Sequence, residues 1–378
     1  MSNVSLKNLP NNIVDLIKYV GQHADHENAS AYLVGGVVRD LLLKKENFDL
    51  DIVIEINAID FAETFSKVNG FLFVKHPKFM TATVNIDKNI HIDFVTARKE
   101  SYTKPGALPD VVPSTIEDDL FRRDFTINAM ALVINDSNFG KIVDFYQGQK
   151  DLEDKIIRVF HEQSFVDDPT RILRAIRFEQ RFDFKMDDNT EKAMEIALSE
   201  PVIMSVTPIR YFEEFKKICV EPRAASCFRR LADIGMLKNI FDNFAFDDKC
   251  FELFDSIESF LVGSNFKNFS FKSWIIYMMA ILDCFSLEEA KKMLVRFSIE
   301  KKDQQKIIFL KKNSNLSKQL LIEQINLDEV FDGFKTLSVE EMIFFYCKNK
   351  KILVQQCIDE DLKEIISKGV FNGANGSS

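Results

Sequence analysis

The stretch from Tyr32 to Glu55 constrains the fold most, because two apolar runs flank a glycine pair and a short polar-apolar segment. Both runs are rich in β-branched residues, which favours strands, and the segment between them suits a short helix. Gly35 and Gly36 stand between the first strand and the helix, where backbone N–H groups can approach a phosphate closely. This strand–glycine–helix–strand unit predicts an α+β domain.

Two carboxylates, Asp49 and Asp51, lie at the start of the second strand. A spacing of two residues on a strand points both side chains to the same face. Paired carboxylates beside a phosphate cradle suit divalent cations bound to a nucleoside triphosphate. Each motif alone has an ordinary explanation, a turn for the glycines and a solvated strand end for the carboxylates. Their order and closeness favour the joint interpretation.

Composition limits the class of protein. A chain of 378 residues, 46% hydrophobic and 28% charged, is long enough for two or more globular domains. No apolar run reaches eighteen residues, and the first twelve residues lack a signal-peptide core, so we expect no membrane segment. Six cysteines without a CxxC motif predict free thiols in a reducing, cytoplasmic setting. With a net charge of −9, any nucleic-acid surface must be a local basic patch.

Helices and strands are expected to alternate in the first hundred residues. Hydrophobic spacing predicts helices over residues 11–24 and 58–68, and strands over residues 71–74, 82–86 and 90–95. The last strand contains Asp93, either a third carboxylate facing the pair or an exposed strand position. Residues 99–118 hold three prolines and one glycine, which predicts a loop without a packed strand or helix. From Phe165 onward the periodicity is helical, so an all-α region should follow the α+β domain.

Residues 165–182 carry four arginines at helical spacing. Asp167 or Asp168 can cap a helix that begins at Pro169. The arginines then line one face, and they repel one another unless something anionic lies against them. A solvated basic face is the alternative. The four arginines are Arg171, Arg174, Arg177 and Arg181.

Asp168 and Arg171 together suggest recognition of a base. The carboxylate accepts hydrogen bonds and the guanidinium donates them. Adenine and cytosine present a donor beside an acceptor on the pairing edge, whereas guanine and uracil present the opposite order. The pair would therefore accept A and C, because each mismatched buried polar group costs about 1–3 kcal/mol.

The segment DLFRRDFTINAMA, residues 119–131, places Arg122, Arg123 and Asp124 at the start of an apolar, helix-like run. Asp124 could accept a hydrogen bond from a ribose hydroxyl, and the arginines could bind phosphate oxygens. A capped helix with no ligand is the alternative interpretation.

Four motifs in this order, LVGGVVRDLLL, DLDIV, DLFRRDFTINAMA and DPTRILRAIRF, resemble those of the class II tRNA nucleotidyltransferases, which share their ancestry with bacterial poly(A) polymerases. The resemblance covers about residues 30–240. It implies an α+β, polymerase-β-like nucleotidyltransferase head followed by an all-α neck, body and tail. The implied boundaries are 1–162 for the head, 163–240 for the neck and 241–378 for the body and tail.

The resemblance also implies roles for individual residues. Asp49 and Asp51 would hold two Mg²⁺ ions, with Asp93 as a further catalytic carboxylate. The family motif usually begins with Glu where this chain has Asp167, and this shorter side chain gives Arg171 less support. The implied nucleotide-binding residues are Gly35, Gly36, Arg39, Arg123, Asp124, Asn128, Asp168, Arg171, Arg174 and Arg177.

The implied activity is template-independent addition of CMP, AMP or both to the 3′ end of tRNA, from CTP and ATP. Addition of A only, addition of CC only, and poly(A) synthesis remain alternatives that share these motifs. Lysines of the helical half would hold the tRNA backbone, or they would form a solvated helix face. These are Lys301, Lys302, Lys306, Lys311 and Lys312.

Overall fold

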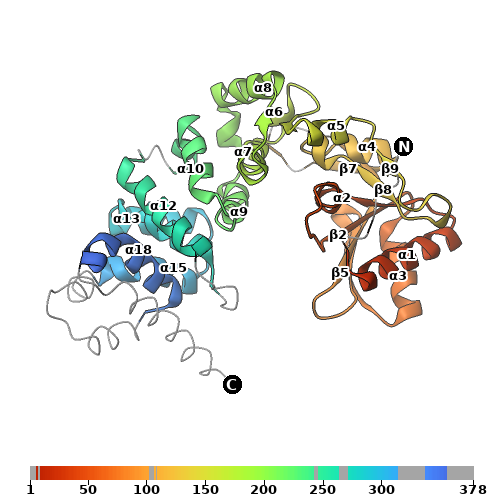
Figure 1. Cartoon of the computed structure of the whole chain (residues 1–378), viewed down its shortest axis with the longest axis horizontal. Coiled ribbons are helices and arrows are strands. Elements are labelled where there is room, and N and C mark those ends of the chain that lie inside the picture. Colours follow the sequence, from red (N-terminus) through yellow and green to blue (C-terminus); the bar gives the residue numbers. More distant parts are fainter. Residues whose placement is uncertain are drawn as a thin grey trace. The chain divides into compact units, whose positions relative to one another are not determined.

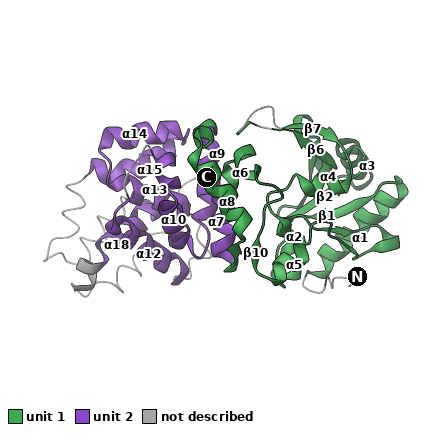
Figure 2. Cartoon of the chain, turned by 90° about the horizontal axis from the view of Figure 1, so that it is seen from above, with its two compact units in different colours: residues 1–171, 182–205 green, residues 172–181, 206–378 purple. Residues whose placement is uncertain are grey.

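The computed structural model describes Leu6 and residues 9–101, 106–107, 109–241, 246–263, 271–313 and 337–355. These residues form two compact units (Figure 2): unit 1 comprises residues 1–171 and 182–205, and unit 2 comprises residues 172–181 and 206–378. Parts of the expected 99–118 loop and of the expected body and tail lie outside the described residues. The expected division into head, neck, and body with tail, with boundaries after residues 162 and 240, distinguishes three parts instead of two units. This division stays a prediction.

Unit 1 is built on a seven-stranded mixed sheet in the order β3-β4-β5-β2-β1-β8-β9. Figure 1 labels β2, β5, β8 and β9 of this sheet. β2 pairs with β5 in parallel, and every other neighbouring pair in this sheet is antiparallel. The expected strand–glycine–helix–strand unit and the three further strands are confirmed. The strands are β1 Ala31–Val34, β2 Leu50–Ile54, β3 Leu72–His76, β4 Thr81–Asn85, β5 His91–Thr96, β8 Ala131–Val133 and β9 Ile142–Val143.

Helix α3, Ala58–Asn69, shows how the sheet is covered. Its buried face carries Phe61 and Phe65, whose rings lie 5.2 and 5.8 Å from the ring of Phe94 on β5. Such aromatic contacts fix the helix against the sheet. The helices expected over residues 11–24 and 58–68 are confirmed. The remaining helices of unit 1 are α1 Asn11–His26, α2 Gly36–Leu42, α4 Ile116–Phe121, α5 Gly148–Glu153, α6 Ser164–Asp167 and α8 Asp188–Ser199, with short 3-10 turns at Pro77–Phe79, Thr126–Asn128, Asp136–Asn138 and Pro201–Ser205.

The expectation of a loop without packed strand or helix over residues 99–118 is wrong. β6, Arg98–Ser101, pairs antiparallel with β7, Asp110–Pro113, and α4 begins at Ile116. The prolines misled the prediction, because a proline is tolerated in an edge strand. Pro113 lies at the end of this two-stranded ribbon, opposite Arg98. A second small sheet pairs β10, Ile156–Ile157, with β11, Lys185–Met186.

The helix-like run expected over residues 119–131 is also wrong. α4 ends at Phe121, a 3-10 turn covers Thr126–Asn128, and β8 begins at Ala131. The apolar residues of this run are buried except for Phe121, so their pattern does not distinguish a helix from a turn that enters a buried strand. The polar residues between α4 and the 3-10 turn therefore lie in a connection.

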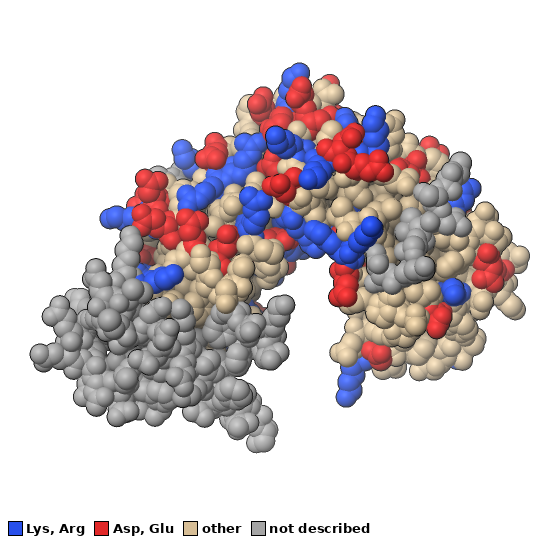
Figure 3. Space-filling view, viewed as in Figure 1, with Lys and Arg blue, Asp and Glu red and all other residues tan. Residues whose placement is uncertain are grey.

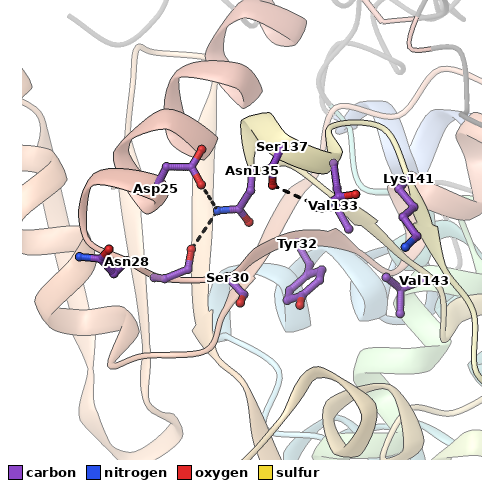
Figure 4. A pocket seen from close by; sticks show the side chains of 11 residues that line it. Asp25, Asn28, Ser30, Tyr32, Val133, Asn135, Ser137, Lys141 and Val143 are labelled. Carbon is purple, nitrogen blue, oxygen red and sulfur yellow. Dashed lines mark hydrogen bonds between the residues drawn. The ribbon is translucent and has the colours of Figure 1, made fainter.

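The end of α1 is fixed to the sheet by Asn135 (Figure 4). Its Nδ2 donates to Asp25 Oδ1 at 2.7 Å and to the carbonyl of Ala29 at 2.9 Å, and its Oδ1 accepts from the N–H of Ala31 at 2.8 Å. A pocket of about 520 Å³ lies beside these residues. A Cβ on Gly21 would lie 1.8 Å from the carbonyl oxygen of residue 134. Only a glycine therefore allows α1 to pack this closely against the chain that leaves β8. The entry to β1 is thereby fixed.

Unit 2 is all helical over its described residues, as expected. Helix α13 is buried on every side from Ile275 to Leu282, which is the pattern of a central helix. It contacts α9, α12, α15 and α18. No helix within the described ranges is long and apolar enough to cross a membrane. The helices are α7 Thr170–Phe182 in its central part, α9 Pro208–Ile218, α10 Ala224–Asp233, α11 Met236–Ile240, α12 Asp248–Gly263, α13 Ser273–Asp283, α14 Leu287–Arg296, α15 Lys301–Lys312 and α18 Val339–Gln355.

Candidate active site

The parallel strands β2 and β5 bring the acidic side chains together. Asp51 and Asp93 are direct partners in the register, so their side chains point to the same face of the sheet. Continuing the register by one residue sets Asp49 against His91. The ligand atoms of Asp49, His91 and Asp93 all lie within 4.8 Å of one another. The structure thus places Asp93 beside the carboxylate pair, and it adds a histidine that the sequence interpretation missed.

This cluster concentrates negative charge. Burial, reinforced by the charge of Asp49, raises the pKa of Asp51 to about 6, and nearby Arg123 offsets part of this rise. Thr83 Oγ1 donates a hydrogen bond of 2.5 Å to Asp93 Oδ1 from the adjacent strand β4 and orients that carboxylate. Carboxylate oxygens are the ligands that hard divalent cations prefer, so the donor set fits such an ion.

Gly35 provides the space between the acidic cluster and an arginine. Its φ is +77°, a conformation that glycine adopts at little cost. A Cβ at this position would lie 2.8 Å from Arg123 Nη1 and 3.9 Å from Asp51 Oδ2. Arg123 Nε is buried and has no hydrogen-bond partner among the described residues. An anion that entered beside Gly35 would meet this guanidinium. Next to it, Gly36 begins α2.

Three residues expected to bind nucleotide form one buried hydrogen-bonded chain. Arg39, only 4% exposed, donates to both carboxylate oxygens of Asp40, at 2.9 and 3.0 Å. Its Nη1 donates to Asn128 Oδ1 at 2.5 Å, and Asn128 Nδ2 donates to Asp124 Oδ1 at 2.9 Å. The guanidinium also lies 4.7 Å from the ring of Phe182. This chain fixes the position of Asp124, while the nucleotide-binding role of the three residues stays a prediction.

Asp119 anchors the neighbouring arginines and was missed by the sequence interpretation. It has no exposed surface and accepts hydrogen bonds from Arg122 Nε (2.9 Å), Arg122 Nη2 (2.7 Å) and Arg123 Nη2 (3.0 Å). Burial alone would raise the pKa of Asp119, but the two guanidinium groups hold it below its ordinary value. Arg122 Nη1 also donates to Glu100 at 2.9 Å. The helical spacing of three and four residues was the available signal.

Asp168 and Arg171, the pair expected to select the base, lie at the start of α7, and Arg171 contacts the segment that contains Arg122. Asp168 Oδ1 accepts from the N–H of Thr170 at 3.1 Å and from its hydroxyl at 2.7 Å, so Asp168 caps α7 as expected. Arg171 is 8% exposed, and its Nη2 donates to the carbonyl of Arg122 at 3.1 Å. A weaker contact of 3.5 Å joins its Nη1 to the carbonyl of Ser164. Selection of a base by this pair stays a prediction.

The remaining arginines of α7 meet glutamates of unit 2. Arg174 Nη1 lies 3.5 Å from Glu214 Oε1, and Arg177 Nη1 donates to Glu221 Oε1 at 3.0 Å. Arg181 also reaches Glu221, at 3.5 Å. For these three arginines, the chain itself therefore supplies the anionic partner. A nucleotide-binding role of Arg174 and Arg177 stays a prediction.

Charges of both signs are interspersed on the face shown in Figure 3. Among the expected tRNA-binding lysines, Lys306 pairs with Glu340 at 2.9 Å, and Lys311 donates to the carbonyl of Asp283 at 2.9 Å. The other three, Lys301, Lys302 and Lys312, are exposed. Contact of these lysines with RNA stays a prediction.

The mixed sheet with carboxylates on the parallel strands β2 and β5 defines a polymerase-β-like nucleotidyltransferase head. The family model described as the poly A polymerase head domain matches residues 31–158. A second model, described as a probable RNA- and SrmB-binding site of polymerase A, matches residues 183–247. The chain belongs to the family of class II tRNA nucleotidyltransferases and bacterial poly(A) polymerases.

Individual relatives agree with this assignment. An A-adding tRNA nucleotidyltransferase of Aquifex aeolicus is 34% identical over 89% of this chain and 40% of its own length. Another A-adding tRNA nucleotidyltransferase, from Halalkalibacterium halodurans, is 42% identical over 60% of this chain and 53% of its own. The solved Thermotoga maritima CCA-adding enzyme complexed with tRNA is 33% identical, with a TM-score of 0.75 over 94% of this chain and 85% of that one. The chain thus spans about half or less of these two curated relatives.

Proposed function

We propose that this protein adds CMP, AMP or both to the 3′ end of tRNA, using CTP and ATP and no nucleic-acid template. One observation carries the proposal: Asp51 on β2 and Asp93 on β5 lie opposite each other, with Asp49 directly before β2, beside Gly35 and Arg123. A cluster of carboxylates next to an anion-accepting guanidinium suits metal-assisted transfer from a nucleoside triphosphate. The names of the relatives supply the substrate class, tRNA.

Divalent metal binding fits the donor set, and we assign two Mg²⁺ ions to Asp49 and Asp51 with Asp93 beside them. When bound, such ions lower the pKa of an attacking hydroxyl and offset the charge of the departing pyrophosphate. The carboxylates supply hard oxygen ligands from two adjacent strands. Thr83 holds the carboxylate of Asp93 in place through its hydrogen bond.

The other residues of the site bind and orient the nucleotide. The backbone at Gly35 and the guanidinium of Arg123 lie where the triphosphate would enter. Asp124, fixed by Asn128, accepts a hydrogen bond from the ribose. Asp168 and Arg171 select the base through their acceptor and donor groups. The 3′-hydroxyl of the tRNA then attacks the α-phosphorus and gives up its proton to solvent; a new P–O bond forms, the bond to the β-phosphate breaks, and pyrophosphate leaves.

The decisive test is nucleotide addition to tRNAs shortened by one, two and three 3′-terminal residues, with ATP alone, CTP alone and both. The Asp51→Ala variant should lose incorporation while retaining tRNA binding, because the carboxylate serves the metal and not the RNA. Asp60→Ala, which removes an exposed carboxylate of α3, is the matched control and should keep full activity. Retained incorporation by Asp51→Ala would contradict the metal assignment.

The same assay separates the alternative functions. An A-adding protein, the activity named for the Aquifex and Halalkalibacterium relatives, would extend only tRNA that already ends in CC. A CC-adding protein would stop before the last residue. A poly(A) polymerase would extend unrelated RNA with long A tracts.

We further propose that the helical residues of unit 2 contact the tRNA and that the protein acts in the cytoplasm. Five cysteines in the described part of the chain are free thiols, which supports a reducing compartment. Crosslinking of bound tRNA to the exposed lysines of α15 tests the first point.

A further inference from the structure

His91 lies at the start of β5, on the same face of the strand as Asp93. A ring nitrogen of this histidine lies within 4.8 Å of carboxylate oxygens of both Asp49 and Asp93. The sequence interpretation assigned only oxygen ligands to this site. The spacing His91-x-Asp93 on β5 repeats the spacing Asp49-x-Asp51 on the neighbouring segment. The start of β2 and β5 therefore carry four potential ligands, and those of Asp49, His91 and Asp93 form the close group.

The fold makes no visible use of the His91 ring. The side chain is exposed, and neither a hydrogen bond nor an ion pair joins it to any residue that the structure describes. Asp93, by contrast, is oriented by Thr83 through a hydrogen bond of 2.5 Å. The imidazole therefore stands beside an oriented carboxylate with its nitrogen atoms available. This arrangement suits a ligand of the metal better than a group that stabilises the sheet.

We propose that His91 is a nitrogen ligand of the metal site formed with Asp49 and Asp93, and that its imidazole raises the affinity of this site for transition-metal dications such as Mn²⁺. Mg²⁺ takes oxygen ligands and keeps much of its water, whereas first-row transition metals gain affinity from imidazole. The inference rests on the proposed function only in placing the metal at these carboxylates. It identifies a nitrogen ligand, and a gain in affinity for transition metals, in addition to what the carboxylates provide.

Mn²⁺ is the probe, because its unpaired electrons report directly on coordinated nitrogen. Pulsed EPR of the full chain loaded with Mn²⁺ should show a ¹⁴N coupling, which changes to a ¹⁵N coupling when the histidines are ¹⁵N-labelled. The His91→Asn variant should lose this coupling. His76→Asn is the matched control, since His76 is an exposed histidine at the end of β3 in the same sheet, and it should keep the coupling.

Affinity gives a second readout. The dissociation constant for Mn²⁺, measured from the EPR signal of the free ion, should rise at least about tenfold in His91→Asn, the loss seen on removing even an outer-shell partner of a metal. The dissociation constant for Mg²⁺, measured by competition with Mn²⁺, should change much less. Far-UV circular dichroism establishes that each variant is folded, and His91→Gln provides a second substitution.

Bound Mn²⁺ without a nitrogen coupling in the unmodified protein would overturn the inference, as would equal Mn²⁺ affinities in the unmodified protein and His91→Asn. The outcome is independent of the proposed function. If the coupling is present and no tRNA is extended, the proposed function fails and the metal ligand stands. If tRNA is extended and no coupling is seen, only the role of His91 fails.

Discussion

Replacing Asp119 with alanine tests the electrostatic support of the candidate site. The fully buried carboxylate accepts three hydrogen bonds from Arg122 and Arg123. Three independent, fully buried hydrogen bonds to charged groups would contribute about 4.5–9 kcal/mol at 1.5–3 kcal/mol each. The arginine side chains keep 17% and 16% of their exposure, so water can replace part of the loss, and Arg122 keeps its bond to Glu100. We therefore expect a loss of about 3 kcal/mol, the lower end for breaking a buried pair.

The single tryptophan allows the unfolding of unit 2 to be followed separately from that of unit 1, which contains Asp119. Trp274 lies on α13 of unit 2, with its ring 5.1 Å from that of Phe212. In urea, tryptophan fluorescence therefore reports the unfolding of unit 2, and far-UV circular dichroism reports both units. The Asp119→Ala variant should lower the free energy of unfolding in the circular dichroism transition. Asp119→Asn, which keeps an acceptor oxygen, should lose less.

Loss of the Asp119 carboxylate should also weaken nucleotide binding. Arg123 would no longer be held beside Gly35, so the dissociation constant for ATP should rise in Asp119→Ala even under conditions where the protein is folded. A loss of stability below about 1 kcal/mol would refute the reasoning, because that is the range of exposed ion pairs.

Three further predictions concern the same unit. Gly35→Ala should destabilise the protein by about 1–3 kcal/mol and weaken ATP binding, because a positive φ is strained for alanine and the new Cβ meets Arg123. Gly70→Ala, at a similar φ with open space around it, is the control for backbone strain alone. Thermal unfolding and ATP titration measure the two effects. Arg171→Lys should raise incorporation of GMP and UMP relative to AMP and CMP when each nucleotide is supplied singly, whereas a uniform fall in rate would argue against base selection. Because the pKa of Asp119 is lowered in the folded state, its contribution is present above the ordinary aspartate pKa and is lost as pH falls through the folded-state value; urea titrations across acidic pH should show this dependence, and Asp119→Asn should flatten it.

The sequence was sufficient for groups that share one element. The apolar run predicts the strand that carries Asp51, although β2 begins only after Asp49, and the proline at position 169 indicates a cap at Asp167 or Asp168, of which Asp168 is the one observed. Local periodicity determines which way such side chains point. The order of the four motifs, together with the apolar runs, was sufficient to predict an α+β head domain followed by an all-α region.

Contacts between distant elements could not be found in the same way. Arg174 and Arg177 meet Glu214 and Glu221, which lie 40 and 44 residues further along the chain. The ligand cluster depends on the parallel register of β2 and β5. The position of His91 in the sequence does not indicate that it lies beside Asp49. Local pattern was also ambiguous where apolar residues are buried throughout, as at the start of β8.

The parallel pairing of β2 and β5 has a consequence for insertions and deletions. Adding or removing one residue within either strand would turn its carboxylate to the opposite face of the sheet and separate Asp51 from Asp93. A change of length in the turn at residues 87–89, between β4 and β5, would leave both strands in place. Aligned relatives should therefore vary in length at this turn and stay ungapped along the two strands, and libraries for engineering the protein should place their length changes accordingly.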